Sequence, residues 1–407
     1  MFVTEKLAYN PCLYNIALSP IVAISEKAKK RAKEYEAKTG EEFIFFQRGD
    51  IDLAPLPGII EEVEKSLRCG KTKYPASGGS DEAKTALVNK LALYNNIHAE
   101  KENIVVTYGG QEALGLAFEL FRGKRAAVLS PVWSVLVENF LPYSNIRYEE
   151  VSLNEDNSID YELLEDTLKH VDVFYVNNPQ NPTGKVFTEE DLTKLGEMCV
   201  RHDVAIISDE AYEHIVFEGK KHISLASLPC VKNYSKIFTA FTLSKTFSMT
   251  GFRIGYVVTP DRIAANLMKN VQYTHTAGVV TFVQPAVKAA FSPGFENRIA
   301  QRIKEFEIRR DALYNGLKNI KGIRLNNADG AFYLFVDFSG LIPQELRGNQ
   351  RSEYIFKTLL DNGICVVPGN CFTKQNWYHD YMRLSFSGTS VNIISKSIIR
   401  IKTIFKK

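Results

Sequence analysis

KIFTAFTLSKTF, residues 236–247, contains the pattern from which the fold follows: a short apolar run passes directly into polar residues. Its first part, 237–241, is rich in aromatic and β-branched residues and has the length of a strand. Thr242, Ser244 and Lys245 come immediately after it. A buried strand that ends in polar side chains is typical of an α/β protein with its chemistry at the ends of its strands.

This pattern recurs along the central part of the chain. Further β-branched apolar runs lie at residues 103–108, 171–176, 204–208 and 254–259. Amphipathic segments such as 111–121 separate them. Strands that are apolar on both faces and alternate with helices predict a mostly parallel sheet between two layers of helices, a three-layer α/β domain. The candidate functional residues are those that directly follow each run, because ligands of such sheets bind beyond the carboxyl ends of the strands.

The pattern changes toward the C-terminus. A charged segment at 296–317 predicts a long helix, 332–337 predicts a strand, and 352–360 predicts another helix. These elements predict a smaller α+β domain, and we expect the early helix at 25–40 to pack with it. The predicted organisation is an N-terminal arm and part of the small domain in residues 1–49, a large domain in 50–293 and the rest of the small domain in 294–407.

Composition excludes several classes of protein. Hydrophobic residues make up 45% and charged residues 24% of the 407 residues, which is ordinary for a globular protein. Lys and Arg number 50 against 47 Asp and Glu, and the resulting charge of +3 is too balanced for a nucleic-acid-binding surface. No apolar stretch approaches the roughly 18–20 residues that cross a bilayer. The cysteines form no Cys-x-x-Cys pair, so we expect a cytoplasmic protein without a disulfide framework.

Lys245 is the first candidate for chemistry. Most lysines are exposed, but this one is flanked by Ser244 and Thr246 directly after a predicted strand. In a partly desolvated pocket a lysine has a lowered pKa and can form a Schiff base with a carbonyl group. Arg253, eight residues further on, is suited to bidentate binding of a phosphate or a carboxylate.

Two further clusters also follow predicted strands. Gly109 and Gly110 precede a helix whose first N–H groups can bind an anion, although a lone pair of glycines is more often an ordinary turn. Asp209 follows the run 204–208, where a carboxylate is either solvated or held for a cationic partner. A metal site that combines it with the nearby histidines would match no zinc spacing, so we expect no metal.

Together these clusters contain what pyridoxal phosphate needs from a protein. The cofactor requires a lysine for its aldehyde, an acid beside its pyridine nitrogen, an anion site for its phosphate and a ring to stack on. The residues for these roles are, in turn, Lys245; Asp209; Gly110 with Thr242 and Arg253; and Trp133. No G-x-G-x-x-G, G-x-S-x-G or H-E-x-x-H motif supports a nucleotide-binding protein or a hydrolase.

Three motifs, in order and with similar separations, resemble those of the class I and II aminotransferases, the aspartate aminotransferase superfamily of fold-type I pyridoxal-phosphate enzymes. They are Asn178-Pro179-Gln180-Asn181-Pro182-Thr183-Gly184, Ser208-Asp209-Glu210-Ala211-Tyr212, and Leu243-Ser244-Lys245 followed by Gly251-Phe252-Arg253-Ile254-Gly255-Tyr256. The resemblance covers about residues 45–386. It implies a large domain that binds pyridoxal phosphate and a smaller domain made from both chain ends.

The resemblance also implies roles for the cofactor-binding residues. Lys245 resembles the lysine that holds the cofactor as an internal aldimine, and Asp209 resembles the acid at the pyridine nitrogen. Asn181 and Tyr212 match the pair that hydrogen-bonds the phenolic oxygen. The remaining matches are the phosphate contacts, the stacking ring and a tyrosine that reaches the neighbouring subunit's site: Gly110, Gln111, Thr242, Ser244 and Arg253; Trp133; and Tyr74.

Substrate binding is implied in the same way. Arg383 resembles the arginine that binds the α-carboxylate together with Asn181, and a planar guanidinium fits that group well. Gly49 resembles a small-domain glycine whose backbone closes over the same carboxylate. No lysine or arginine follows Trp133, where the sequence reads Ser134-Val135-Leu136, and this argues against aspartate as the preferred donor.

The implied activity is a pyridoxal-phosphate-dependent aminotransferase that moves an amino group from an L-amino acid to a 2-oxo acid by a ping-pong mechanism. Two alternatives stay open. A β-eliminating lyase or related synthase would keep every cofactor-binding residue and differ in its products. A regulator that binds the cofactor without turnover would have no need of Arg383. The expected partners are the two substrates and, through Tyr74, a second copy of the chain in a homodimer, with no nucleic acid and no membrane.

Overall fold

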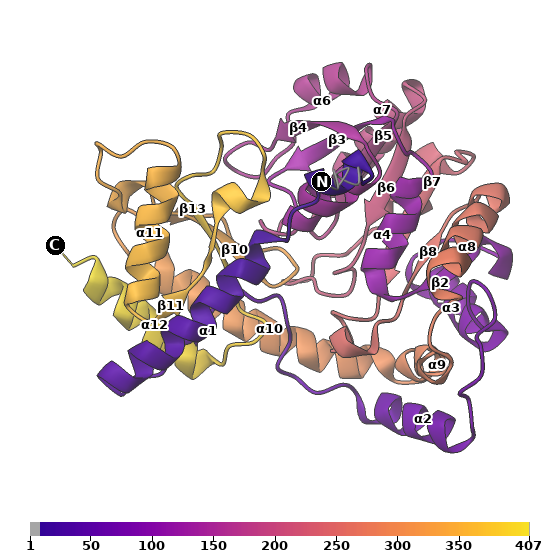
Figure 1. Cartoon of the computed structure of the whole chain (residues 1–407), viewed down its shortest axis with the longest axis horizontal. Coiled ribbons are helices and arrows are strands. Elements are labelled where there is room, and N and C mark those ends of the chain that lie inside the picture. Colours follow the sequence, from indigo (N-terminus) through magenta and orange to yellow (C-terminus); the bar gives the residue numbers. More distant parts are fainter. Residues whose placement is uncertain (1–8, 407) are drawn as a thin grey trace, which may run out of the picture.

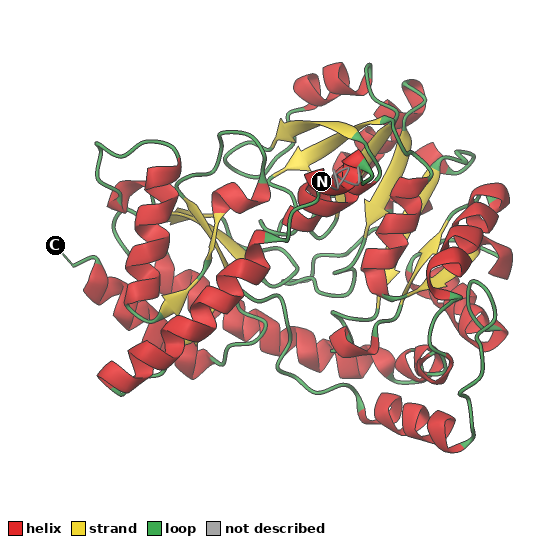
Figure 2. Ribbon diagram, in the orientation of Figure 1, coloured by secondary structure: helices red, strands yellow, loops and turns green. Residues whose placement is uncertain are grey.

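The computed structural model describes residues 9–406, whose helices and strands form two groups that lie side by side (Figures 1 and 2). One group surrounds a seven-stranded sheet, and the other contains two smaller sheets. Among the described residues, no helix combines the length and the apolar character needed to cross a membrane.

The seven-stranded sheet is mostly parallel. Its strands, in chain order, are β2 (Ile104–Thr107), β3 (Arg125–Ser130), β4 (Arg147–Ser152), β5 (Val173–Asn177), β6 (Ala205–Asp209), β7 (Ile237–Thr242) and β8 (Gly255–Val258). Their order across the sheet is β2-β8-β7-β6-β5-β3-β4. Only β8 runs antiparallel to its neighbours, β2 and β7. The predicted α/β class with a mostly parallel central sheet is confirmed.

Helices cover both faces of this sheet. They are α2 (Pro57–Arg68), α3 (Asp81–Tyr94), α4 (Gly109–Glu119), α5 (Leu141–Tyr143), α6 (Tyr161–Leu168), α7 (Glu189–Arg201), α8 (Arg262–Thr276) and α9 (Ala286–Ala290). α4, α5 and α8 share one core with Val173 and Tyr175 of β5, while α6 and α7 share another with Phe174 and Val176. Alternate residues of a buried strand therefore enter opposite cores.

The two ends of the chain form the second group. α1 (Pro20–Thr39) packs on α11 (Asn349–Asp361), and β1 (Ile44–Phe45) pairs with β11 (Ile364–Cys365), as Figure 1 shows by the contact of indigo and orange elements. The other elements are α10 (Phe295–Leu317), α12 (Val391–Ile404), β9 (Arg324–Leu325), β10 (Tyr333–Asp337), β12 (Val367–Pro368) and β13 (Tyr381–Ser385). The division near residues 49 and 293 stays a proposal.

α10 links the two groups. Phe295 and Ile299, in its first turns, pack in the core beside the large sheet. Phe306 and Leu313, further along, pack in the core of the second group. One continuous helix therefore contributes to both cores, and any movement of one group relative to the other must bend or tilt it.

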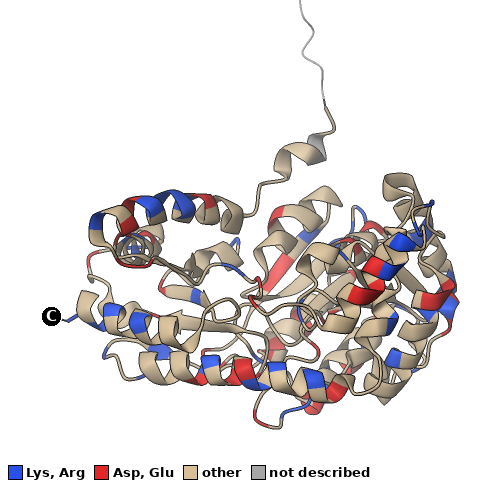
Figure 3. Cartoon of the chain, turned by 90° about the horizontal axis from the view of Figure 1, so that it is seen from below, with Lys and Arg blue, Asp and Glu red and all other residues tan. Residues whose placement is uncertain are grey.

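Charged side chains are mixed on the surface. In the view of Figure 3, basic and acidic positions are interspersed over the molecule, with no large area of one sign. Many of them pair locally, as Arg122 does with Glu119 and Lys169 with Asp166. This distribution agrees with the nearly balanced charge of the sequence.

Candidate functional site

The candidate residues gather where three neighbouring strands end. Asn177 ends β5, Asp209 ends β6 and Thr242 ends β7, and these strands are adjacent in the sheet. Lys245 lies in the turn that follows β7. The polar residues that follow separate apolar runs in the sequence are therefore neighbours in space.

Lys245 has an environment unlike that of a surface lysine. Its Nζ donates a hydrogen bond to the backbone oxygen of Gly49 at 2.8 Å. Burial lowers the pKa of Lys245 to about 8; Asp50 opposes this shift, whereas Arg383 and Arg253 reinforce it. A lysine with this pKa is neutral in a substantial fraction of molecules near pH 7–8, so it can act as a nucleophile or a base.

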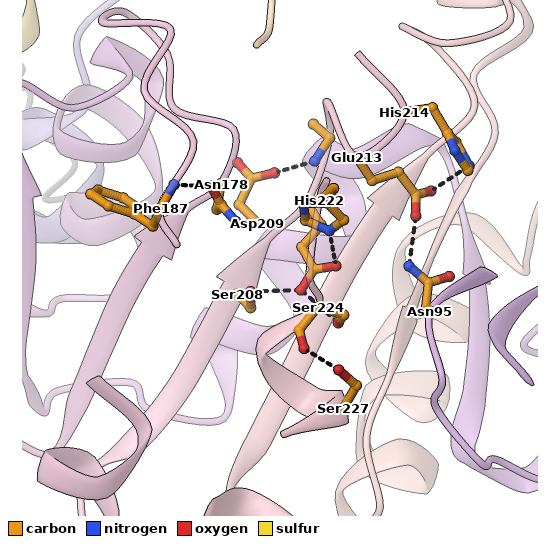
Figure 4. A network of polar contacts seen from close by, with 12 residues as sticks. Asn95, Asn178, Phe187, Ser208, Asp209, Glu213, His214, His222, Ser224 and Ser227 are labelled. Carbon is orange, nitrogen blue, oxygen red and sulfur yellow. Dashed lines mark hydrogen bonds and ion pairs between the residues drawn. The ribbon is translucent and has the colours of Figure 1, made fainter. Parts of the chain in front are cut away.

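Asp209 is a buried acid with a donor on each oxygen. Its Oδ2 accepts a hydrogen bond from the Tyr175 hydroxyl at 2.7 Å. Its Oδ1 accepts one from the Ala211 N–H at 3.2 Å, the dashed line at Asp209 in Figure 4. Burial raises the pKa of Asp209 to about 6, and these two hydrogen bonds oppose the rise. A cationic partner would favour the charged carboxylate further.

Arg383, on β13, is a buried cation whose hydrogen-bond partners among the described residues are an amide and a backbone oxygen rather than a carboxylate. Its Nη1 donates to Asn181 Oδ1 at 3.1 Å and its Nη2 to the backbone oxygen of Gln47 at 2.7 Å. Its guanidinium lies 4.4 Å from the centre of the Tyr333 ring. The Nε has no hydrogen-bond partner in the described chain. Such a group is suited to an incoming anion.

A candidate anion site lies at the start of α4. The N-cap residue Tyr108 makes no side-chain capping hydrogen bond, so the N–H groups of Gly110 and Gln111 can bind an incoming acceptor, while Glu112 Oε2 accepts from the Tyr108 N–H at 2.7 Å. A Cβ on Gly110 would lie 3.3 Å from Cβ of Thr242, so glycine allows the helix to approach the end of β7. Thr242 Oγ1 in turn donates to Ser244 Oγ at 2.8 Å.

Arg253 completes this anion site from the turn before β8. Its Nη2 donates to the backbone oxygen of Tyr108 at 3.3 Å, and its Nη1 donates to Thr250 at 2.9 Å. A Cβ on Gly109, which has φ +73°, would come within 2.7 Å of the same Nη2. Two glycines, two hydroxyls and a guanidinium therefore converge on one place.

Tyr333, on β10, lies beside these candidate residues. Its hydroxyl lies 3.0 Å from the hydroxyl of Tyr212. A Cβ on Gly49 would lie 2.2 Å from the same oxygen, so only glycine fits beside it. Gly49, Tyr212 and Tyr333 thus meet in one buried contact, and the Asn181 N–H is held nearby by Asn177 Oδ1 at 2.7 Å.

Trp133, Gln111 and Tyr74 are less buried than Asp209 and Arg383. Trp133 is half-buried, and its ring centre is 6.0 Å from that of Phe140. The Gln111 side chain is exposed. Tyr74 is 91% exposed in the single chain, so its predicted role in a neighbouring subunit stays a prediction.

Sequence reasoning missed the side chains that anchor the segment after β6. Glu210 accepts hydrogen bonds from Ser208 at 3.0 Å and Ser224 at 2.8 Å, and it pairs with His222 at 2.9 Å (Figure 4). Glu213 accepts from Asn95 at 2.8 Å, also visible in Figure 4, and from Lys90. The signal in the sequence was acids directly after an apolar run, and from the sequence alone these are either solvated or held by a partner.

The donor set fits pyridoxal phosphate. The anion site at α4 suits a phosphate, the buried Asp209 suits a pyridinium nitrogen, and the amine of Lys245 suits an aldehyde. The Nε of Arg383 has no hydrogen-bond partner among the described residues, so this guanidinium can bind a substrate carboxylate. Each of these requirements is thus met by a different group of the cluster.

Comparison with known proteins agrees with this geometry. The model of the family "Aminotransferase class I and II" matches residues 41–395. A probable aspartate/prephenate aminotransferase of Aquifex aeolicus is 33% identical over 94% of this chain and 95% of its own length. Among solved structures, aspartate aminotransferase from Thermus thermophilus with maleate has a TM-score of 0.87 at 28% identity and covers 98% of this chain and 99% of its own. An aromatic aminotransferase from Pyrococcus horikoshii has a TM-score of 0.82 at 26% identity and covers 93% and 98%.

Proposed function

Because the chain belongs to the family of class I and II aminotransferases, we propose that it transfers the amino group of an L-amino acid to a 2-oxo acid with Lys245 as the reactive amine and Arg383 as the carboxylate clamp. As a member of this family it is a pyridoxal-phosphate-dependent transferase. The assignment of these two residues rests on a short backbone segment that accepts a hydrogen bond from each of them.

That segment is Gln47 to Gly49. The backbone oxygen of Gln47 accepts a hydrogen bond from Arg383, and that of Gly49, two residues on, accepts one from Lys245. The amine and the guanidinium are thus held close to each other on one side of the site. An α-amino acid carries its amino group and its carboxylate on a single carbon, so a substrate of this kind can meet both cations at once. A regulator without turnover would have no use for this pairing.

The chain's own residues have distinct tasks in this reaction. Arg383 and Asn181 orient the carboxylate, and Lys245, with its pKa near 8, removes and returns the proton at the α-carbon. Pyridoxal phosphate supplies, when bound, the electron sink for the charge that develops at that carbon. Asp209 holds the pyridine nitrogen in its charged form. Tyr212 supplies a protonated hydroxyl, because burial raises its pKa.

We propose that the preferred amino donor is a neutral or aromatic amino acid rather than aspartate. The place where a second basic residue would follow Trp133 holds Ser134, whose hydroxyl is buried and lies 3.3 Å from that of Ser19. A distal carboxylate would thus lack a cation there.

The absorption spectrum of the purified protein tests the proposed reaction. With pyridoxal phosphate bound and an amino acid added without an acceptor, the visible cofactor band should fade and one equivalent of 2-oxo acid should appear per site. Phenylalanine and alanine should cause this at lower concentration than aspartate. Ammonia released in excess of the sites would instead establish a β-eliminating lyase, and absence of any band after cofactor addition would refute the assignment.

We also propose that Tyr74 completes the phosphate site of a second copy of the chain. The exposed Tyr74 follows Lys73, whose backbone oxygen is fixed by the Thr281 hydroxyl at 2.6 Å, so the segment is held although its side chain is free of the single chain's core. Replacing Tyr74 with phenylalanine should weaken cofactor binding about 10-fold, the effect of one hydrogen bond to a charged group. Equilibrium dialysis with pyridoxal phosphate measures this change.

Subunit mixing separates a shared site from a simple structural effect. In a heterodimer of Tyr74→Phe and Lys245→Ala chains, one site would receive an intact Tyr74 and keep an intact Lys245. Coexpressed chains should therefore regain native cofactor affinity and activity in part of the sites. Sedimentation that shows a fully active monomer would rule out the shared site.

A further inference from the structure

We propose that Tyr175 is a positioning residue for Asp209, whose carboxylate it orients and keeps charged for the pyridine nitrogen of the cofactor. This inference rests on the role of Asp209 in the proposed function. Tyr175 lies within a strand that reads as an uninterrupted apolar run, and the motifs of the sequence assign nothing to it.

The sheet register brings the two side chains together. β5 and β6 are parallel neighbours in which Asn177 lies opposite Asp209 and Tyr175 lies opposite Ile207. Tyr175 and Ile207 point into the same core, and Asp209, two residues after Ile207, points to that side too. The phenol therefore reaches diagonally toward the end of β6, where its hydroxyl lies 2.7 Å from Asp209 Oδ2.

Packing also fixes the position of Tyr175, the donor of this hydrogen bond. Tyr175 is only 1% exposed, and its ring centre lies 6.0 Å from that of Phe118 on α4. Burial raises the pKa of Tyr175 far above its ordinary value, so the hydroxyl keeps its proton and donates. With the Ala211 N–H on Oδ1, each oxygen of Asp209 has one donor from the protein, and the carboxylate cannot rotate without losing both.

The charged neighbours of Asp209 explain why this donor matters. Burial and the adjacent Glu210 raise the pKa of Asp209, whereas Tyr175, Ala211 and Lys245 lower it, with a result of about 6. Tyr212, the other titratable group that interacts with Tyr175, also stays protonated because it is buried. Without the Tyr175 hydroxyl, less would oppose the effect of burial, and the pKa of Asp209 would rise. A larger fraction of Asp209 would then be neutral near pH 7 and unable to pair with a pyridinium.

Tyr175→Phe removes the donor and keeps the ring. We expect the dissociation constant of pyridoxal phosphate to rise about 10-fold, as for one hydrogen bond to a charged group. The acidic limb of the kcat profile should move to higher pH, because the pKa of Asp209 rises. KM for the amino acid should change less than about twofold, because the clamp at Arg383 is untouched.

Tyr256→Phe is the matched control. Tyr256 is also 1% exposed in the large sheet, and its hydroxyl has no hydrogen-bond partner among the described residues. Cofactor affinity and pH profile of this variant should equal those of the native protein. If Tyr175→Phe behaves like Tyr256→Phe, the proposal is overturned.

A double-mutant cycle with Asp209→Asn decides between positioning and general packing. Once the carboxylate is gone, Tyr175→Phe should change cofactor affinity no further, whereas effects that simply multiply would refute the positioning role. Melting of the apoprotein reports folding separately, so a less stable variant still gives an answer through the cycle. If Asp209→Asn leaves cofactor affinity and spectrum unchanged, the proposed role of Asp209 fails. If Asp209→Asn changes them but Tyr175→Phe does not, only the further inference fails.

Discussion

Replacing Lys245 with alanine should lower kcat for transamination on the order of 10⁴-fold or more, because one side chain serves as both nucleophile and base. Nζ of Lys245 is the amine whose pKa burial brings to about 8 in this site. Arg383 and Arg253 carry permanent charge and cannot take over proton transfer. A steady-state assay that follows 2-oxo acid formation measures the loss.

Binding should survive this substitution. The groups proposed for the phosphate and the carboxylate remain, so affinity for pyridoxal phosphate and for a 2-oxo acid should change far less than kcat. Lys221→Ala, at an exposed lysine, should match the native enzyme in the same assay. A Lys245→Ala protein that transaminates at a near-native rate would show that another residue carries the chemistry.

The fold was predictable where apolar runs were long and buried on both faces. The runs at 171–176 and 204–208 became β5 and β6 nearly residue for residue. β4, at the edge of the sheet, was missed because its residues 147–150 are charged or aromatic and partly solvated. β3 was missed because it begins Arg-Ala-Ala, and alanine gives little indication of a strand.

Helix boundaries show the same limit. The early helix was predicted to begin near Ser25, but α1 begins at Pro20 after Ser19. Proline at the first helical position fits a helix start as well as a turn, because its missing N–H is not needed there. Gly40 ends the helix in the left-handed conformation, as expected.

Site residues divide by how local their signal is. Lys245 and Asp209 could be proposed because each directly follows a strand, a relation visible in a few neighbouring residues. Tyr175 is 34 positions from Asp209, and Lys90 is 123 positions from Glu213. Pairing over such distances depends on register and packing, which a single sequence does not specify. For this reason the reactive groups could be proposed from the sequence and their supports could not.

The support with the largest expected effect on stability is Lys90. Its Nζ lies 2.6 Å and 2.5 Å from the two carboxylate oxygens of Glu213, and 4.1 Å from the centre of the Phe241 ring. Both charged side chains are buried. Lys90→Met should lower the free energy of unfolding by about 3–5 kcal/mol, because it leaves the charge of Glu213 buried and unpaired. Denaturant unfolding of the apoprotein measures the change.

The dependence on pH should reverse in this variant. Burial alone would raise the pKa of Glu213, but Lys90, His214 and Asn95 together lower it to about 2 in the native protein. The native pair therefore stabilises fully above the ordinary pKa of a glutamate, near 4.5, and this contribution is lost as the pH falls through about 2. Without Lys90, burial dominates and the folded-state pKa rises above 4.5, so the deficit of the variant should shrink as the pH falls toward 4.5 and below.

Two comparisons distinguish a buried pair from ordinary loss of charge. Lys236→Met breaks an exposed pair with Asp203 and should cost less than about 1 kcal/mol. Lys90→Met combined with Glu213→Leu removes both charges and should recover most of the lost stability, since an apolar pair replaces a buried ion pair at little cost. If the double variant were no more stable than the single one, the loss would come from packing around Phe241. Glu213 directly follows Tyr212, so its pairing also bears on the position of Tyr212. In the double variant, cofactor affinity should recover together with stability only if charge balance, and not the shape of the two side chains, holds this segment in place.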